Sequence, residues 1–224
     1  MCEDKIQYKV EYRKRKTVGI LINENGEVIV RAPIGVSIDN IDKIIDKKRR
    51  WIEEKVGMFK EREQLKENEI MYLGKVCKIK VLEQKFLKRD FVYFDGSTFV
   101  LNVSDSLKIE NTLEKWLREE CYKKIKELEG RYVGHFPKAP LEIKVKEQKR
   151  KWGCCTYDNR MFFNWHLIMA RESAIEYVVV HEMCHMVYKN HYKEFWSLVE
   201  KIFPDYKEEH LYLKEKGYLM KINI

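Results

Sequence analysis

His181, Glu182 and His185 form the pattern His-Glu-x-x-His, and His191 follows six residues later. The surrounding segment Ala174–Tyr188 is apolar and contains neither Gly nor Pro, so we expect it to form a buried helix. Residues four positions apart share one helix face, so the first two histidines can aim ring nitrogens at one point. A single Zn²⁺ accepts this spacing, and Glu182 would lie beside it, able to take a proton from a metal-bound water.

The alternative is that His181 and His185 are core histidines satisfied by ordinary hydrogen bonds. The strongly apolar run Tyr177–Val180 leads directly into His181 and Glu182. Two adjacent polar side chains are costly to bury there unless they have partners. This cost favours the metal site over the simpler interpretation.

His191 can join the same metal only if the chain turns after Met186, because a continuous helix would carry it to another face. Asn190 supplies a means, since it tolerates left-handed backbone and is a good N-cap. We therefore expect a second helix over His191–Phe203, with His191 in its first turn. Three imidazoles leave one coordination position open, which is typical of catalytic zinc. The alternative is an exposed histidine beside Tyr192.

The elements that position these residues predict an α+β fold. We expect residues 106–224 to form the core that carries the site, with a helix over Ile109–Gly130 and a small sheet. Strands are expected at Leu141–Val145 and Met161–Trp165, before the histidine helix. A final helix begins near Asp205, whose spacing from Glu208 resembles a capping box, and stops near Gly217.

Residues 1–105 are expected to form a β-rich subdomain with one long helix, at about 37–67, capped by Ser37 or Asp39. Asn25-Gly26 between alternating apolar residues predicts a tight hairpin. Short strands should follow the helix, in Glu69–Glu83 and Phe91–Val103.

The chain has 224 residues and a formal charge of +8, from 44 basic and 36 acidic residues. Nucleic acid or a nucleotide is therefore a possible partner for basic clusters that contain Arg49, Arg50 and Arg150, although a solvated surface is the commoner explanation. No segment resembles a signal peptide or a membrane span, and the six cysteines suggest no disulfide framework. We expect no membrane association and a cytoplasmic protein with reduced thiols.

Several motifs together resemble the YgjP-like metallopeptidase family, which is related in its catalytic core to SprT-like and WLM domains. The matching segments are Lys48–Ile52, Trp152-Gly153-x-Cys155, Asn164-Trp165-x-Leu167, Glu176–His185, His191-x-x-x-Phe195-Trp196 and Pro204–Lys207. The resemblance covers nearly the whole chain and implies a zincin-like metallopeptidase core. It also implies Zn²⁺ as cofactor, with His181, His185 and His191 as ligands and Glu182 as the catalytic base. The family usually has Arg, Ser and Arg at the positions of Lys151, Cys154 and His166.

The expected substrate is a peptide or protein, bound as an extended segment along the sheet edge before the metal helix. Residues expected to contact it are Trp152, Asn164, Lys151 and Tyr192. A second electrophile must stabilise the developing oxyanion. Tyr188, Tyr192, His166 and Lys151 stay open as candidates for it.

Two other functions stay open. The same site could hydrolyse a phosphoanhydride, with Arg49, Arg50, Lys149 and Arg150 neutralising phosphate. The sequence contains no Gly-rich phosphate loop to support nucleotide binding. The chain could instead be a basic nucleic-acid-binding module with a structural zinc, but such a site should have four protein ligands and no need for Glu182.

Overall fold

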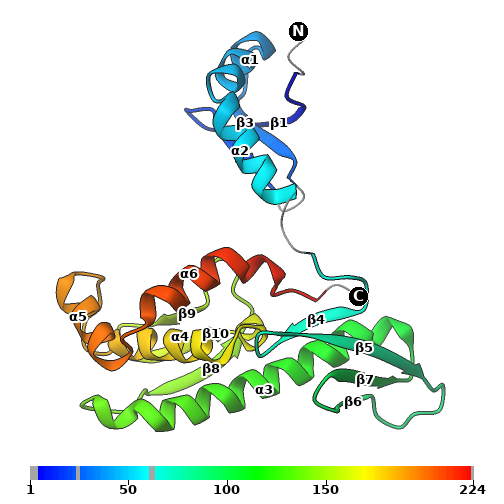
Figure 1. Ribbon diagram of the computed structural model, residues 1–224, viewed down its shortest axis with the longest axis vertical. Helices are drawn as coiled ribbons and strands as arrows, with labels where there is room; N and C mark the ends of the chain where they lie inside the picture. The colour runs from blue at the N-terminus through cyan, green and yellow to red at the C-terminus, as the bar shows by residue number, and fades with distance from the viewer. Residues whose placement is uncertain (1–4, 24–25, 61–63, 223–224) are drawn as a thin grey trace. The chain divides into compact units, whose positions relative to one another are not determined.

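The computed structural model describes residues 5–23, 26–60 and 64–222, and it confirms the α+β fold class (Figure 1). Contacts within the chain divide it into two compact units, Met1–Gln64 and Leu65–Ile224. We call them the N-terminal and the C-terminal unit. Among the described residues, no helix combines the length and the apolar character that crossing a membrane requires.

The N-terminal unit contains a three-stranded sheet. Its strands are β1 (Tyr8–Arg13), β2 (Gly19–Ile22) and β3 (Val28–Pro33). The central strand β3 pairs in parallel with β1 and antiparallel with β2, with Ile20 opposite Val30. The antiparallel pairing confirms the expected hairpin, although Asn25 of its turn lies outside the described residues. A small core joins the sheet to the helices through Val28, Val30, Ala32, Ile41, Ile45 and Ile52.

The prediction of a single long helix over residues 37–67 is wrong. The structure has two helices, α1 (Ile38–Lys47) and α2 (Arg49–Lys60). The Ser37 side chain caps α1 by accepting the Asn40 N–H, as expected. The break falls at Lys48, whose N–H is shared by the Ile44 and Ile45 carbonyls and so tightens the last turn of α1.

The C-terminal unit begins with a four-stranded sheet of order β4-β5-β7-β6. Its strands are β4 (Glu69–Tyr72), β5 (Lys75–Glu83), β6 (Phe91–Phe94) and β7 (Thr98–Val103). These strands were expected to belong with the first part of the chain, which was to end at residue 105. Instead, Phe99 and Leu101 of β7 share a core with Leu113 and Leu117 of the next helix, so the compact units divide after Gln64.

That helix, α3 (Ile109–Tyr132), runs two residues past Gly130, which was expected to end it. It supports a second sheet of order β8-β10-β9. The strands are β8 (Glu142–Lys146), β9 (Gly153–Cys155) and β10 (Arg160–Asn164). The central strand β10 is parallel to β8 and antiparallel to β9, so β9 lies at one edge.

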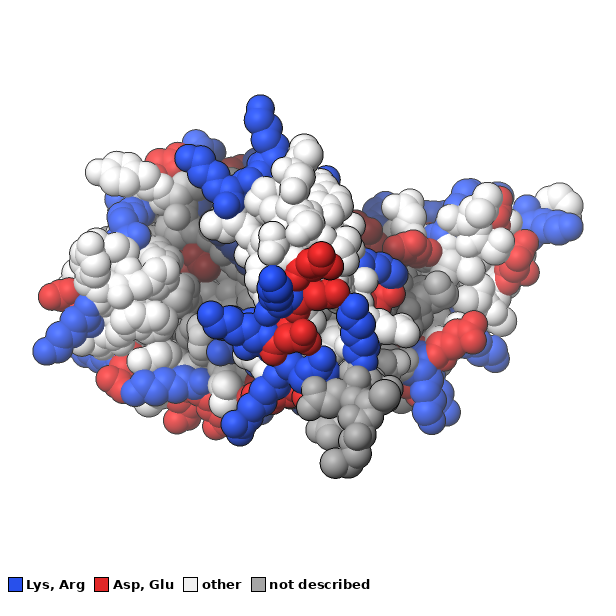
Figure 2. All heavy atoms as spheres, turned by 90° about the horizontal axis from the view of Figure 1, so that it is seen from above, with Lys and Arg blue, Asp and Glu red and all other residues white. Residues whose placement is uncertain are grey.

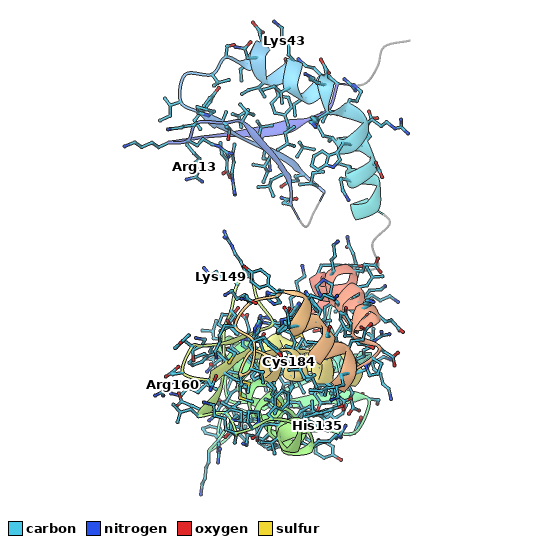
Figure 3. All side chains as sticks on the ribbon, turned by 90° about the vertical axis from the view of Figure 1, so that its left-hand side faces the viewer. Arg13, Lys43, His135, Lys149, Arg160 and Cys184 are labelled. Carbon is cyan, nitrogen blue, oxygen red and sulfur yellow. The ribbon has the colours of Figure 1, made fainter. Side chains whose placement is uncertain are left out.

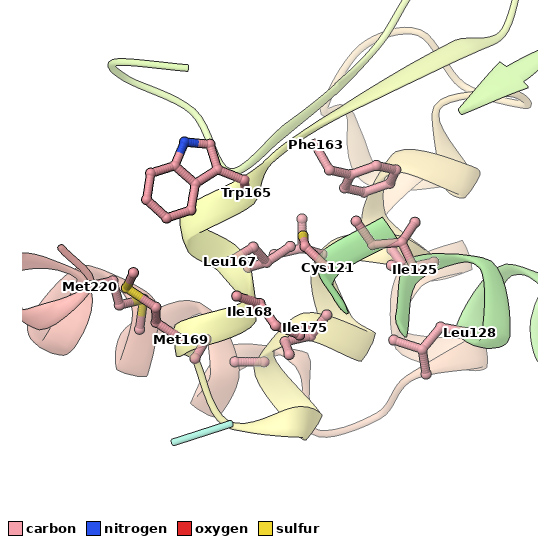
Figure 4. Packing of buried hydrophobic residues seen from close by; sticks show 14 of the residues in the cluster. Cys121, Ile125, Leu128, Phe163, Trp165, Leu167, Ile168, Met169, Ile175 and Met220 are labelled. Atoms are coloured by element: carbon pink, nitrogen blue, oxygen red, sulfur yellow. The ribbon is translucent and has the colours of Figure 1, made fainter. Parts of the chain in front are cut away.

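Three helices complete the C-terminal unit: α4 (Glu172–Cys184), α5 (Lys193–Ile202) and α6 (Tyr206–Lys216). The last begins after Asp205 and ends at Gly217, as expected, but the Asp205 side chain makes no capping hydrogen bond, so the expected capping box is not formed. Figure 4 shows side chains from α3, β10, the 3₁₀ turn Trp165–Met169 and α4 converging in one core. Cys121 and Ile125 of α3 lie there with Phe163 of β10 and Ile175 of α4. This packing holds α4, which carries the histidine pair, in a fixed place.

Candidate metal centre

The helix α4 is buried over most of its length, because every residue from Ala174 to Val180 except Glu176 is apolar. It ends at Cys184, earlier than the expected Tyr188, and His185 is its C-cap residue. The Met186 and Val187 N–H groups bond back to the carbonyls of Met183 and Cys184. This tight turn sends the chain back toward the helix face that carries His181 and His185.

The three histidines come together as the sequence predicts. His191 Nε2 lies 3.1 Å from His181 Nε2 and 3.2 Å from His185 Nε2. One ligand atom from each ring lies within 4.8 Å of the others. The three imidazoles can therefore converge on one ion.

His191 reaches this position in a different way from the one expected. It lies in the loop after α4, because α5 begins only at Lys193 and its N-cap residue is Tyr192. Asn190 is not a helix cap, and it is not among the described residues with positive φ. The turn at the end of α4, and not a helix start, brings His191 back to the other two rings.

Outer contacts orient two of the rings. The Nδ1–H of His185 donates to the Tyr188 carbonyl at 2.9 Å, which leaves Nε2 free to bind an ion. The Nδ1 atom of His181 lies 3.4 Å from the Tyr177 hydroxyl, one turn earlier on α4. Burial raises the pKa of Tyr177, so its hydroxyl keeps its proton.

Burial also keeps the histidines uncharged. It lowers the pKa of His181 to about 3, with a further lowering by the neighbouring imidazoles. The pKa values of His185 and His191 are lowered by burial as well. Neutral imidazole is the form that binds a metal, so the cluster needs no deprotonation near pH 7. Three nitrogen donors fit a divalent ion such as Zn²⁺.

Glu182 points its carboxylate into the space beside the histidines and is 5% exposed. Its Oε2 atom is buried and lacks a hydrogen-bond partner among the described residues. Burial raises the pKa of Glu182 to about 8, while the Lys151 charge and the Cys155 backbone N–H act in the opposite direction. A buried carboxylate with an unsatisfied oxygen is costly unless it serves a site, and here it adjoins three metal-binding groups.

The edge strand β9 passes directly beside Glu182. Hydrogen bonds join Asn164 N–H to the Trp152 carbonyl and Thr156 N–H to the Arg160 carbonyl. In an antiparallel ladder, the alternate residues Gly153 and Cys155 then direct their backbone groups away from β10. These groups face the outer edge of the sheet, on the side of α4.

A pocket of about 490 Å³ opens between this strand, α4 and α6. Its lining residues are Trp152, Gly153, Tyr177, Val178, His181, Glu182, His191, Trp196, His210, Leu213 and Lys214. Apolar and aromatic side chains form most of the wall, and the histidines, Glu182 and Lys214 supply the polar groups. This composition is typical of a site for a small or extended ligand.

The sequence profile of the YgjP-like, metallopeptidase domain matches residues 16–216. The chain belongs to the YgjP-like metallopeptidase family. The matched range includes most of both compact units, so the N-terminal unit is part of the family pattern as well. No curated protein sequence matches the chain. Membership supports a metal-dependent hydrolase, and it confirms the resemblance seen in the sequence.

In this YgjP-like protein, the residues expected to contact substrate occupy different places. Trp152 lines the pocket, and its indole lies against Gly217 at the end of α6. Lys151 is exposed, with its charge near Glu182. Asn164 is buried and donates to the Gln148 and Lys151 carbonyls, so it holds the loop before β9.

The candidates for oxyanion stabilisation are not brought together. Tyr192 is 69% exposed and is not one of the described residues that line the pocket. His166 stacks on Trp165 at 3.7 Å between ring centroids and contacts Asn164. Tyr188 contributes its backbone carbonyl, which accepts from His185.

Within the C-terminal unit, Lys149 and Arg150 are not among the described residues that line the pocket. Arg49 pairs with Asp46 at 2.9 Å and Glu53 at 3.6 Å, which favours a solvated helix face. Arg150 and Lys149 are exposed, and Figure 3 shows Lys149 extending outward from the C-terminal unit. Basic and acidic side chains are interspersed on the face shown in Figure 2.

Sequence reasoning missed several residues of the pocket, namely Tyr177, Trp196, His210, Leu213 and Lys214. Tyr177 stands one helical turn before His181, so helical spacing could have identified it. His210 belongs to α6 and has no nearby motif that points to the metal centre. Only the packing of α6 against α4 brings it there.

Proposed function

We propose that the chain is a zinc-dependent peptidase in which His181, His185 and His191 hold the ion and Glu182 is the general base. The observation that carries this proposal is the buried Glu182 carboxylate, with one unsatisfied oxygen, beside three converging imidazoles. A bound Zn²⁺ would act as a Lewis acid and make water a stronger nucleophile at neutral pH. The donor set supports zinc, because three neutral imidazoles match its common catalytic sites.

Glu182 would take the proton of the attacking water and deliver it to the leaving amine. Its pKa of about 8 without metal lies near the working pH of most proteins, which suits a group that both accepts and donates. The Cys155 backbone N–H and the Lys151 charge favour the carboxylate form. The lowered histidine pKa values keep the ligands neutral over the same pH range.

An extended peptide fits the shape of the site. The outward backbone groups of Gly153 can pair with a substrate main chain, which would add a strand to the sheet at β9. Gly153 also lines the pocket, so a peptide paired there would place a side chain among Trp152, Trp196 and Leu213. These walls favour a bulky apolar residue next to the bond that is cut. Lys214 is the one Lys or Arg among the described residues that line the pocket, so the lining offers little positive charge for a phosphate group.

The test uses purified wild type in two forms, stripped of metal by a chelator and reloaded with zinc. Each form is incubated with unfolded casein and, separately, with a nucleoside triphosphate. We expect cleavage of casein by the zinc form alone and no release of phosphate. His191→Ala serves as the matched variant, because it removes one proposed ligand from an exposed loop, and it should be inactive after reloading.

Cleavage of the triphosphate alone would contradict the peptidase proposal and favour the phosphohydrolase. Equal casein cleavage by the stripped form, with zinc absent by elemental analysis, would contradict the metal-dependent mechanism. Zinc binding without cleavage of either substrate would contradict the proposal for unfolded protein substrates.

A further inference from the structure

The three histidines differ in the group that contacts each ring on the side away from the proposed metal ion. His185 donates to a backbone carbonyl, that of Tyr188, at 2.9 Å. His191 lies against the rings of Phe195 and Trp196. His181 alone faces a side-chain hydroxyl, that of Tyr177, so its outer contact can be altered by mutation without touching the backbone.

The Tyr177 hydroxyl connects two histidines from different helices. It lies 3.4 Å from His181 Nδ1 and 3.2 Å from His210 Nδ1. The Tyr177 ring is 4% exposed and packs edge-on against both imidazoles, at centroid distances of 5.7 Å and 6.2 Å. A row of three groups, His181, Tyr177 and His210, therefore runs from the metal centre to α6.

The order of protons along this row follows from the first member. If His181 binds an ion through Nε2, its Nδ1 carries a proton and must donate. The Tyr177 hydroxyl then accepts from His181, and its own proton points to the remaining partner. That partner is His210 Nδ1, which accepts. Each donor in the row then faces one acceptor.

We propose that Tyr177 and His210 are positioning residues that act in series on the metal ligand His181. Tyr177 orients the His181 ring and fixes its tautomer, and His210 fixes the direction of the Tyr177 hydroxyl. This inference rests on the proposed metal centre, and it assigns to α6 a part in zinc affinity. Neither residue is required to touch substrate for this purpose.

The position of α6 is itself secured close to His210. Arg171, the N-cap residue of α4, donates to the neighbouring Glu209 carboxylate at 2.8 Å and 3.0 Å. Its own backbone N–H donates to the Tyr212 hydroxyl at 3.3 Å. These bonds join the start of α4 to the middle of α6. His210 is therefore held at a defined distance from Tyr177.

The test measures the zinc dissociation constant by competition with a chromophoric chelator at one pH. The single variants are Tyr177→Phe, His210→Leu and His210→Asn. A double variant combines Tyr177→Phe with His210→Leu. Losing the hydrogen-bond partner of a metal-ligating histidine lowers metal affinity roughly 10- to 100-fold, and we expect a loss of zinc affinity in this range for Tyr177→Phe. His210→Leu should weaken binding about 3- to 10-fold, since Tyr177 can still accept from His181. His210→Asn should stay within about twofold of wild type, because Oδ1 can accept where Nδ1 did.

The double variant separates a series from two independent effects. If His210 acts only through the hydroxyl, the double variant binds zinc no more weakly than Tyr177→Phe alone. If the two losses of zinc affinity multiply in the double variant, His210 does not act through Tyr177. Unchanged zinc affinity in Tyr177→Phe would overturn the inference altogether. Wild type that binds no zinc would overturn the proposed function with it, so the two failures are distinguishable.

Two controls keep the outcome interpretable. Tyr206→Phe removes a hydroxyl from a nearby ring that stacks on Trp196 and lies 6.4 Å from the Tyr177 ring centroid. It should leave zinc affinity unchanged. His210 is exposed, so its variants should fold even if loss of the buried Tyr177 hydroxyl disturbs packing. Thermal unfolding of the metal-free variants checks this directly.

Discussion

Glu182 lies so close to the backbone of Gly153 that a Cβ on this glycine would stand 2.7 Å from Glu182 Cγ and 2.9 Å from Oε1. The contact joins the edge strand β9 to the helix that carries the histidines. It gives a physical reason for glycine after Trp152, because any side chain there would displace the carboxylate. The strand that is proposed to bind the peptide therefore directly contacts the proposed general base.

Gly153→Ala should therefore impair catalysis while leaving the fold intact. A shift of the carboxylate by about 1 Å can cost on the order of 100-fold in rate, and we expect a loss of that order in kcat. Turnover of casein with zinc-loaded protein is the measurement. Gly130→Ala is the matched control, because nothing lies within 4 Å of its added Cβ and it sits inside α3. It should keep full activity and add up to about 1 kcal/mol of stability. Full activity of Gly153→Ala would show that the close contact is unimportant.

The raised pKa of Glu182 predicts an unusual pH dependence for the metal-free protein. The pKa of Glu182 is about 8 in the folded state, and we take the ordinary value of 4.5 for the unfolded state. Between these two pH values, the folded state therefore holds a proton that the unfolded state has released. The free energy of unfolding should therefore fall as pH rises between these values. His181 has the opposite effect, but only between about 3 and 6.5.

Between pH 6.5 and 8 the contribution of Glu182 is isolated from that of His181. Over this window it should lower the stability of the wild type by about 2 kcal/mol relative to Glu182→Gln. Urea unfolding of both metal-free proteins at several pH values checks this. Parallel pH profiles for the two proteins would contradict the raised pKa.

The Arg171–Glu209 ion pair should contribute more to the free energy of unfolding than the neighbouring Arg171–Glu208 pair. Glu209 is 4% exposed and bonds to Arg171 through both oxygens, whereas Glu208 is exposed and makes one bond to the same guanidinium. Removing one member of a buried pair leaves the other uncompensated. Because Arg171 is partly exposed, we expect Glu209→Gln to cost about 2 kcal/mol and Glu208→Gln less than about 1 kcal/mol. Equal losses in urea unfolding would show that burial of Glu209 does not matter.

The spacing of residues along the sequence predicted the convergence of the three histidines more accurately than it predicted the helix boundaries around them. His181 and His185 share a helix face because local geometry alone requires it. The place of His191 depends on the turn after Cys184, whose form is decided by hydrogen bonds to Met183 and Cys184 and not by residue type at Asn190. The expected approach of His191 was right, and the expected helix start was wrong.

Long-range packing explains the larger errors. The apolar stripe of residues 37–67 continues through Lys48, so no pattern marked the break between α1 and α2. The strands β4 to β7 were grouped with the earlier strands as one β-rich region, but their apolar faces pack on α3. The boundary between the compact units therefore lies after Gln64. His210 was missed because its partner Tyr177 is 33 positions away, on another helix.

Zinc content and casein turnover of wild type and Glu182→Gln, measured on the same preparations, test the central claim most directly. Glu182 is proposed as the base and not as a ligand, so both proteins should bind about one zinc. The kcat of the variant should fall by about 100- to 10,000-fold, which is the usual contribution of a general base. Turnover near the wild-type rate, or loss of zinc in the variant, would contradict the account.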